Sequence, residues 1–198
     1  MTINKLVHNY CIILLLLISN VANAEDPKGL KIGDKAPNFI SLDQFGNTID
    51  LEKQLDKGPV VLLFYRGHWC KYCNRQLEEL SDSLKFIVAK GASIIAVTPE
   101  VMEFVDETSK QYKNAFRIIS DKNMKIMKAY AVSFEVNKSM VAMYKFGGIN
   151  LIEFNGENGT TLPVPATYII NEDGIIDYVF FDENYKKRVS VKTLLKHL

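Results

Sequence analysis

Cysteine, tryptophan and an excess of either charge are scarce in this chain. Its 198 residues include three cysteines, one tryptophan and three histidines, and 24 basic side chains nearly balance 23 acidic ones. So few cysteines exclude a disulfide-dense mini-protein, and the near-neutral charge removes the electrostatic case for a nucleic-acid partner. The apolar share of 47% indicates a globular domain rather than a disordered chain. The odd cysteine count is the first feature that needs an explanation.

The chain also lacks an apolar run long enough to form a helix that spans a bilayer, which needs about 20 apolar residues. The run from Tyr10 to Ile18 follows Lys5 and precedes the small residues Ala22 and Ala24. A basic residue, a short apolar segment and a small-residue site are typical of a secretory signal peptide. We therefore predict that residues 1–24 are a signal peptide cleaved after Ala24. We expect no stable membrane anchor, and export across the inner membrane, most simply to the periplasm.

Cleavage after residue 24 changes both the cysteine count and the charge. The remaining 174 residues (198 − 24) carry 23 basic and 23 acidic side chains, because Lys5 is the only formal charge removed. Cys11 lies at the front of the apolar run, which disfavours a lipoprotein, and it leaves with the peptide. Two cysteines remain, Cys70 and Cys73, and an oxidising compartment permits a disulfide between them. The basic run 186–188 is interpreted as a solvated surface.

The mature sequence alternates predicted strands and helices. Residues 60–65 form a continuous apolar run, typical of a strand buried on both faces. Further strands are predicted at 92–97 and 116–119, and hairpins around 44–47 and over 167–181. Helices are predicted up to Gly91, from Thr98, over 121–130 and over 189–198. Residues 131–162 are less regular and are interpreted as an insertion near the functional site. This order predicts one α/β domain over residues 25–198, with a central mixed sheet flanked by helices.

The helix expected up to Gly91 begins at a Cys-x-x-Cys motif, Cys70-Lys71-Tyr72-Cys73, directly after the strand at 60–65. A thiol attacks as its thiolate, and the unpaired N–H groups and positive dipole end of a helix N-terminus stabilise that charge. The spacing lets the second thiol reach back and resolve a mixed disulfide. The motif therefore indicates a redox site, with Cys70 as the more exposed nucleophile and Cys73 as the resolving partner.

Two other interpretations of the motif are weaker. A static disulfide across so short a loop would constrain little of the unfolded chain. A zinc site would use Cys70, Cys73 and His68, but a structural site needs four ligands and His197 lies at the far end of the chain. No metal and no cofactor are therefore expected.

Four stretches of the sequence resemble the AhpC/TSA peroxiredoxin-like family of thioredoxin-fold proteins. They are Gly-Asp-Lys-Ala-Pro-Asn-Phe at 33–39, the strand and Trp-Cys-x-x-Cys segment at 60–73, Leu-Pro-Val-Pro-Ala-Thr-Tyr at 162–168, and Asp-Gly at 173–174. The resemblance covers nearly all of residues 29–198. It implies a thioredoxin-like fold and either a thiol-dependent peroxidase or a disulfide exchanger.

The sequence departs from the family's peroxide site at three positions. Peroxiredoxins carry Pro-x-x-x-Thr-x-x-Cys after this strand, and that pattern matches Cys73 to the peroxidatic cysteine. Cys70 then stands at the threonine and Arg66 at the proline. Pro165 stands where the family carries an arginine before a Thr-Phe-type strand. The resemblance thus implies peroxide reduction, while the site residues favour disulfide exchange.

Four residues near the two cysteines are candidates for auxiliary roles. Trp69 is expected to shield the nucleophile from water, and Lys71 and Arg66 to lower a thiolate pKa through their charge. Thioredoxin-like proteins carry a cis-proline beside the motif, and the bond before Pro165 is predicted to be that cis bond. For His68 two roles are open, stabilisation of a thiolate or a solvent-facing position in the loop.

We therefore predict an exported thiol oxidoreductase that uses Cys70 and Cys73. Its expected substrates are peroxides or protein disulfides, and its expected reductant is a thioredoxin-like protein or a small thiol. The alternative from a different class is a non-catalytic thioredoxin-fold module that binds a partner or zinc through this loop.

Overall fold

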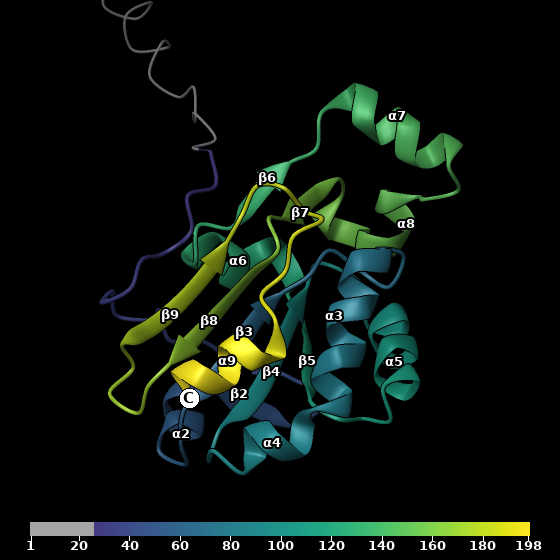
Figure 1. Cartoon of the computed structure of the whole chain (residues 1–198). Coiled ribbons are helices and arrows are strands. Elements are labelled where there is room, and N and C mark those ends of the chain that lie inside the picture. Colours follow the sequence, from purple (N-terminus) through teal and green to yellow (C-terminus); the bar gives the residue numbers. More distant parts are fainter. Residues whose placement is uncertain (1–25) are drawn as a thin grey trace, which may run out of the picture.

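A five-stranded mixed sheet forms the centre of the computed structural model, which describes residues 26–198 (Figure 1). The predicted signal peptide, its cleavage site and Cys11 lie outside the described residues. The strand order is β5 (Arg117–Ser120), β4 (Ser93–Thr98), β3 (Val60–Phe64), β8 (Ala166–Ile170) and β9 (Ile176–Phe181). β3 pairs parallel with β4 and antiparallel with β8. The predicted mixed sheet, its buried central strand and the hairpin over 167–181 are confirmed.

Side chains that alternate along β3 enter two separate hydrophobic layers. Leu62 and Phe64 pack with α2 (Leu51–Leu55) and α6 (Lys125–Ala129) on one face of the sheet. Val61 and Leu63 pack on the other face with helices α3 (Lys71–Asp82), α4 (Leu84–Val88), α5 (Met102–Gln111) and α9 (Val191–His197). The central strand is therefore covered on both faces, as its continuous apolar run predicted.

The single helix predicted to end at Gly91 is two helices, and the prediction is wrong at Ser83. Ser83 has φ −100° and ψ 3°, which separates α3 from α4. After this break Ile87 of α4 is buried, whereas Val88 is 57% exposed. The helix expected from Thr98 starts later, after Val101, whose ψ of 160° is extended. Pro99 therefore precedes α5.

The helix predicted over 121–130 is also interrupted. A short 3₁₀ turn, η1 (Lys122–Met124), precedes α6, and Asn123 and Met124 have φ of +63° and +56°. The Asp121 carboxylate accepts the backbone N–H groups of Ile126 and Met127 at 3.1 and 2.8 Å. The buried carboxylate thus satisfies two of the otherwise unpaired donors at the start of α6.

Residues 131–162 are more regular than the sequence predicted. They contain β6 (Ser133–Glu135), α7 (Lys138–Phe146), α8 (Leu151–Asn155), η2 (Gly156–Asn158) and β7 (Thr161–Pro163). β6 pairs antiparallel with β7, and α7 projects from the rest of the molecule (Figure 1). The remaining elements, β1 (Ile40–Leu42) and β2 (Thr48–Asp50), form the hairpin predicted around 44–47. Across residues 26–198 no helix has the length and apolar character needed to cross a bilayer.

Candidate redox site

The two cysteines lie where the loop after β3 enters α3. Cys70 is the N-terminal capping residue of α3 and has an extended backbone, and its carbonyl accepts the N–H groups of Cys73 and Asn74 at 2.9 and 3.0 Å. The Cys73 thiol lies 2.8 Å from the Cys70 sulfur and donates to it, and both residues are free thiols. Cys70 is 4% exposed and Cys73 is fully buried. Cys70 is therefore the more accessible sulfur, as predicted.

The two thiols have opposite pKa shifts. The hydrogen bond from the Cys73 thiol, the Cys73 backbone N–H and the charges of Arg66 and Arg188 together lower the pKa of Cys70 to about 6, against the effect of burial. Burial and the neighbouring Cys70 raise the pKa of Cys73 well above its usual range. At neutral pH the pair therefore holds a thiolate on Cys70 and a protonated thiol on Cys73, which is the charge distribution a nucleophile and a resolving partner require.

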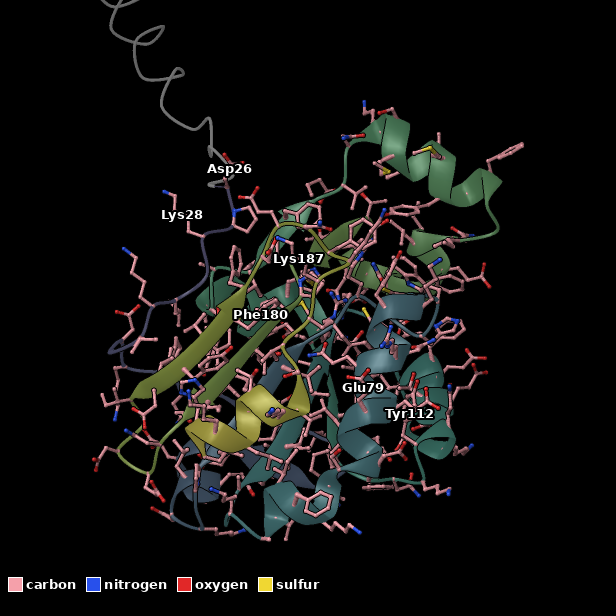
Figure 2. All side chains as sticks on the ribbon, in the orientation of Figure 1. Asp26, Lys28, Glu79, Tyr112, Phe180 and Lys187 are labelled. Carbon is pink, nitrogen blue, oxygen red and sulfur yellow. The ribbon has the colours of Figure 1, made fainter. Side chains whose placement is uncertain are left out.

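Arg188 contributes to the site although the run 186–188 was interpreted as solvated surface. Lys187 fits that interpretation, because it is exposed and pairs with Asp182 at 2.9 Å (Figure 2). The guanidinium of Arg188 instead points inward, and its Nη2 donates to the Cys73 sulfur at 3.2 Å. Its Nη1 donates to the backbone carbonyls of Tyr185 and Lys187 at 2.5 and 2.6 Å, which fixes its orientation. No sequence spacing signals this contact, since 115 residues separate Arg188 from Cys73.

Arg66 is buried rather than on the surface, with 3% of its area exposed. Its guanidinium carbon lies 4.8, 5.4 and 4.4 Å from the ring centres of Trp69, Tyr144 and Tyr185, respectively. Its Nη2 donates to the Tyr144 hydroxyl, so α7 of the insertion reaches the site. The prediction that residues 131–162 lie near the site is therefore confirmed. Trp69 is half-buried and packs against apolar residues of both the main core and the insertion.

His68 faces Glu100, a buried carboxylate that the sequence analysis did not single out. The Nδ1 atom of His68 lies 2.6 Å from Glu100 Oε1, and the His68 backbone N–H donates to Oε2 at 2.9 Å. The ring stacks on Phe104 of α5 at 4.7 Å between ring centres. Burial raises the pKa of Glu100, and the hydrogen bond with Glu100 raises the pKa of His68. His68 therefore anchors the loop before Cys70 to the chain after β4, a role outside the two predicted for it.

The loop also depends on a glycine for this anchor. Gly67 has φ of +147°, and a Cβ built there would lie 2.5 Å from both Glu100 Oε1 and Trp69 Nε1. Only a residue without a side chain lets the backbone pass this close to the carboxylate. Lys71 lies on the other side of Cys70 and is exposed, with its ammonium 5.2 Å from the Tyr72 ring. The positive charges that lower the pKa of Cys70 come from Arg66 and Arg188.

The cis bond predicted before Pro165 is wrong, because residues 26–198 contain no cis peptide bond. The Val164 N–H donates to the Val132 carbonyl at 2.8 Å, which extends the pairing of β6 and β7 up to the proline. The chain then enters β8 directly at Ala166, opposite Phe64, so a tight turn is not needed and the lower-energy trans form serves. Pro165 itself is buried beside the end of β3, near the predicted site.

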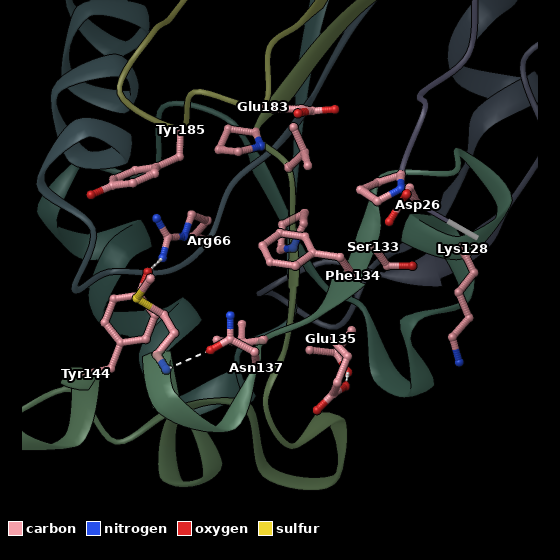
Figure 3. Close-up of a pocket in the computed structure, with 17 residues that line it drawn as sticks. Asp26, Arg66, Lys128, Ser133, Phe134, Glu135, Asn137, Tyr144, Glu183 and Tyr185 are labelled. Atoms are coloured by element: carbon pink, nitrogen blue, oxygen red, sulfur yellow. Dashed lines mark hydrogen bonds between the residues drawn. The ribbon is translucent and has the colours of Figure 1, made fainter. Parts of the chain in front are cut away.

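A groove of about 940 Å³ opens beside this constellation (Figure 3). Its lining includes Arg66, Phe134, Tyr144, Pro165 and Tyr185. The groove therefore lies between the redox loop, the insertion and the segment after β9. For the zinc alternative, the described part of the chain gathers no group of three or more His, Cys, Asp or Glu side chains in a metal-binding arrangement.

Comparison with known proteins identifies the family. The model of the AhpC/TSA family matches residues 32–179, about three quarters of the sequence. The chain belongs to the AhpC/TSA family. The resemblance carried by the four sequence stretches is thereby confirmed.

Curated AhpC/TSA relatives include proteins named for two different activities. The chain is 28% identical over 148 residues to a putative chloroplastic peroxiredoxin Q of Oryza sativa subsp. indica, covering 75% of this chain and 58% of the relative. It is 27% identical over 165 residues to a thiol-disulfide oxidoreductase ResA of Bacillus cereus, covering 83% and 78%. The chain thus spans little more than half the length of the rice relative.

Solved structures confirm the predicted thioredoxin-like fold. The peroxidoxin BcpB of Mycobacterium tuberculosis superposes with a TM-score of 0.66 at 18% identity, covering 85% of this chain and 96% of that one. A peroxiredoxin Q from Xylella fastidiosa, solved as a cysteine-to-serine mutant, has a TM-score of 0.66 at 15% identity, with 85% and 95% covered. At these identities the likeness is one of fold.

Proposed function

We propose that this AhpC/TSA protein is a thiol-disulfide oxidoreductase in which Cys70 attacks and Cys73 resolves. The observation that carries the proposal is the asymmetry of the pair. Cys70 caps α3, is the more exposed sulfur and has a pKa of about 6, whereas Cys73 is fully buried and protonated 2.8 Å away. A fixed structural disulfide needs no such difference between its two thiols. The relationship to ResA supports the same chemistry.

The reaction proceeds in two exchange steps. The Cys70 thiolate attacks one sulfur of a disulfide substrate, so that a mixed disulfide forms and the other substrate sulfur leaves as a thiolate. Cys73 then loses its proton and attacks the Cys70 sulfur, which releases the second substrate sulfur and forms the Cys70–Cys73 disulfide. Two electrons pass to the substrate. A thioredoxin-like protein or a small thiol must supply two electrons to restore the dithiol.

Peroxide reduction is the second candidate, and the relationship to peroxiredoxin Q favours it. The Cys70 thiolate would attack one peroxide oxygen to give a sulfenic acid and release water or an alcohol. Cys73 would then condense with the sulfenic acid and release water. Cys73 occupies the position matched to the peroxidatic cysteine, but its burial and raised pKa support Cys70 as the attacking sulfur here too.

Export belongs to the proposal as well, and its support is the pattern of residues 1–24. Amino-terminal sequencing of the protein purified from a periplasmic extract tests it. A mature chain that begins at Glu25 is the expected result. A full-length chain confined to the cytoplasm would overturn the export proposal without touching the thiol chemistry.

The redox proposal is tested with Cys70→Ser and Cys73→Ser, each assayed for insulin disulfide reduction and for hydrogen peroxide consumption with the same dithiol. Disulfide exchange predicts that Cys70→Ser abolishes insulin reduction and that Cys73→Ser accumulates mixed disulfides. Peroxide consumption by the wild type that is lost in Cys70→Ser, without insulin reduction, would favour the peroxide candidate instead. Peroxide turnover that survives in Cys70→Ser but not in Cys73→Ser would make Cys73 the attacking sulfur. Wild-type behaviour of both variants in both assays would show that the pair is not catalytic.

A further inference from the structure

The positive charge around the redox pair exceeds the negative charge that faces it. Arg66 and Arg188 both lie at the two cysteines, and the Cys70 thiolate supplies one negative charge. Within residues 26–198 neither guanidinium has a carboxylate at ion-pair distance. One of the two cations is therefore left without a counter-ion even when Cys70 is ionised, and burying an uncompensated charge is costly.

Arg66 is the cation without a counter-ion. Arg188 donates to two backbone carbonyls and to the Cys73 sulfur, which fixes it in place. Arg66 has one hydrogen-bond partner, the Tyr144 hydroxyl, and its buried Nε, like that of Arg188, has none. The faces of Trp69, Tyr144 and Tyr185 surround its guanidinium without supplying a formal charge.

Arg66 lines a groove that is large enough for a small molecule. Its volume of about 940 Å³ falls within the range of small-molecule sites. Figure 3 shows Arg66, Tyr144 and Tyr185 together on one side of the groove and Asp26 and Glu135 on the other. The near side favours an anion. The far side also carries Lys128, and its charge together with Asp26 and Glu135 is still net negative, which disfavours a second anion. A ligand with one carboxylate at the Arg66 side fits this distribution of charge.

We propose that the substrate of Cys70 is a small disulfide bearing a carboxylate, which binds Arg66 at the aromatic side of the groove. Guanidinium and carboxylate groups form strong, directional hydrogen bonds, and Arg66 lines the groove without a carboxylate partner of its own. The carboxylate supplies the missing counter-ion and places the adjacent sulfur next to Cys70. This proposal rests on the proposed thiol function, since it names the substrate of that reaction.

Alkylation of Cys70 tests the anion site without requiring redox turnover. The rate constants for negatively charged iodoacetate and neutral iodoacetamide are measured at one pH, and their ratio cancels the fraction of thiolate. Arg66→Gln should lower the iodoacetate-to-iodoacetamide ratio about tenfold. Arg66→Lys, which keeps the charge, should give an intermediate ratio. The matched control is Arg75→Gln on the exposed face of α3, which should keep the wild-type ratio.

Equal ratios in wild type and Arg66→Gln would overturn the proposal. If Arg66→Gln fails to fold, acetate competition in the wild type decides the question. Acetate at constant ionic strength should then slow iodoacetate more than iodoacetamide, and equal slowing would overturn the proposal.

Substrate selectivity provides the second test. The wild type should reduce the mixed disulfide of 3-mercaptopropionate and 2-mercaptoethanol, which bears one carboxylate, with a higher kcat/KM than bis(hydroxyethyl) disulfide, and cystamine with the lowest value. Arg66→Gln should remove that order. If the wild type keeps its iodoacetate preference but reduces neither insulin nor any of the three, the proposed function fails while the anion site stands. If it reduces insulin but none of the three, the function stands and the substrate class is wrong. If it reduces all three equally well, the function stands and the substrate class is wrong.

Discussion

At the scale of single residues, two identical side chains three positions apart become chemically different. Cys70 receives hydrogen bonds from the thiol and the backbone of Cys73, whereas Cys73 is fully enclosed and donates. The Cys-x-x-Cys spacing predicted this division of roles, because the first cysteine of such a motif stands at the helix start. The spacing did not predict Arg188, which reaches Cys73 from a loop 115 residues away. Contacts of this kind depend on tertiary packing and leave no local pattern.

The lowered pKa of Cys70 predicts the pH dependence of its reactivity. Alkylation by iodoacetamide should be constant well above pH 6 and should fall with a midpoint near the pKa of about 6, because only the thiolate reacts. Arg188→Gln should raise this midpoint by about one pH unit, since it removes a nearby positive charge. The rates are followed by mass spectrometry of the Cys70 peptide.

Lys187→Gln is the matched control for that experiment. It removes the same charge from the adjacent, exposed residue and should leave the midpoint unchanged, as Lys187 pairs with Asp182 away from the sulfurs. A midpoint near the ordinary value of 9.0 in the wild type, or equal midpoints in the wild type and Arg188→Gln, would contradict the electrostatic account.

At the scale of elements, the strands were more predictable from sequence than the helices. β3 and the hairpin of β8 and β9 have continuous apolar runs or a marked turn, and burial enforces both. The helix boundaries depend on single backbone angles, such as those of Ser83 and Met124, which no side-chain periodicity encodes. The contact between His68 in the loop before α3 and Glu100 after β4 could not be predicted either, because Glu100 belongs to no recognisable motif in the sequence.

That anchor predicts a stability effect centred on Glu100. Glu100→Ala should lower the free energy of unfolding by roughly 2–3 kcal/mol, because the buried N–H and ring nitrogen of His68 lose their acceptor. Glu100→Gln should cost less, since the amide oxygen can still accept one hydrogen bond. Urea unfolding measures both variants. Glu103→Ala, an exposed residue in the first turn of α5, is the control, and a loss in Glu100→Ala no larger than the control's would refute the anchor.

At the scale of the whole molecule, the sequence predicted a mixed α/β domain with one redox pair, and that prediction is confirmed for the fold. It underestimated residues 131–162, because short elements that pack on the main body have little periodicity of their own. Those elements supply Tyr144 to Arg66 and part of the groove wall. The insertion therefore shapes the groove at Arg66, while the geometry of the sheet and α3 positions the two sulfurs.

The ionised thiol also ties the stability of the whole reduced molecule to pH. The pKa of Cys70 falls from its ordinary value of 9.0 to about 6 on folding, so ionisation favours the folded state. A group with a depressed folded pKa contributes its full stabilisation above the unfolded pKa, and that stabilisation disappears as the pH falls through the folded pKa. Between pH 5 and pH 7 the free energy of unfolding of the reduced wild type should therefore rise by about 1.4 kcal/mol relative to that of Cys70→Ser. Urea unfolding with a phosphine reductant measures this difference.

The same linkage affects the redox potential of the pair. Stabilising the Cys70 thiolate stabilises the dithiol form, so the disulfide becomes a better oxidant as the folded pKa of Cys70 falls. Arg188→Gln should then shift the redox equilibrium toward the disulfide and shrink the pH-dependent stability gain of the reduced protein together. Thiol quantification in a glutathione redox series reports the first quantity, and urea unfolding the second. If only one of the two changes, the charge of Arg188 does not act through the Cys70 thiolate.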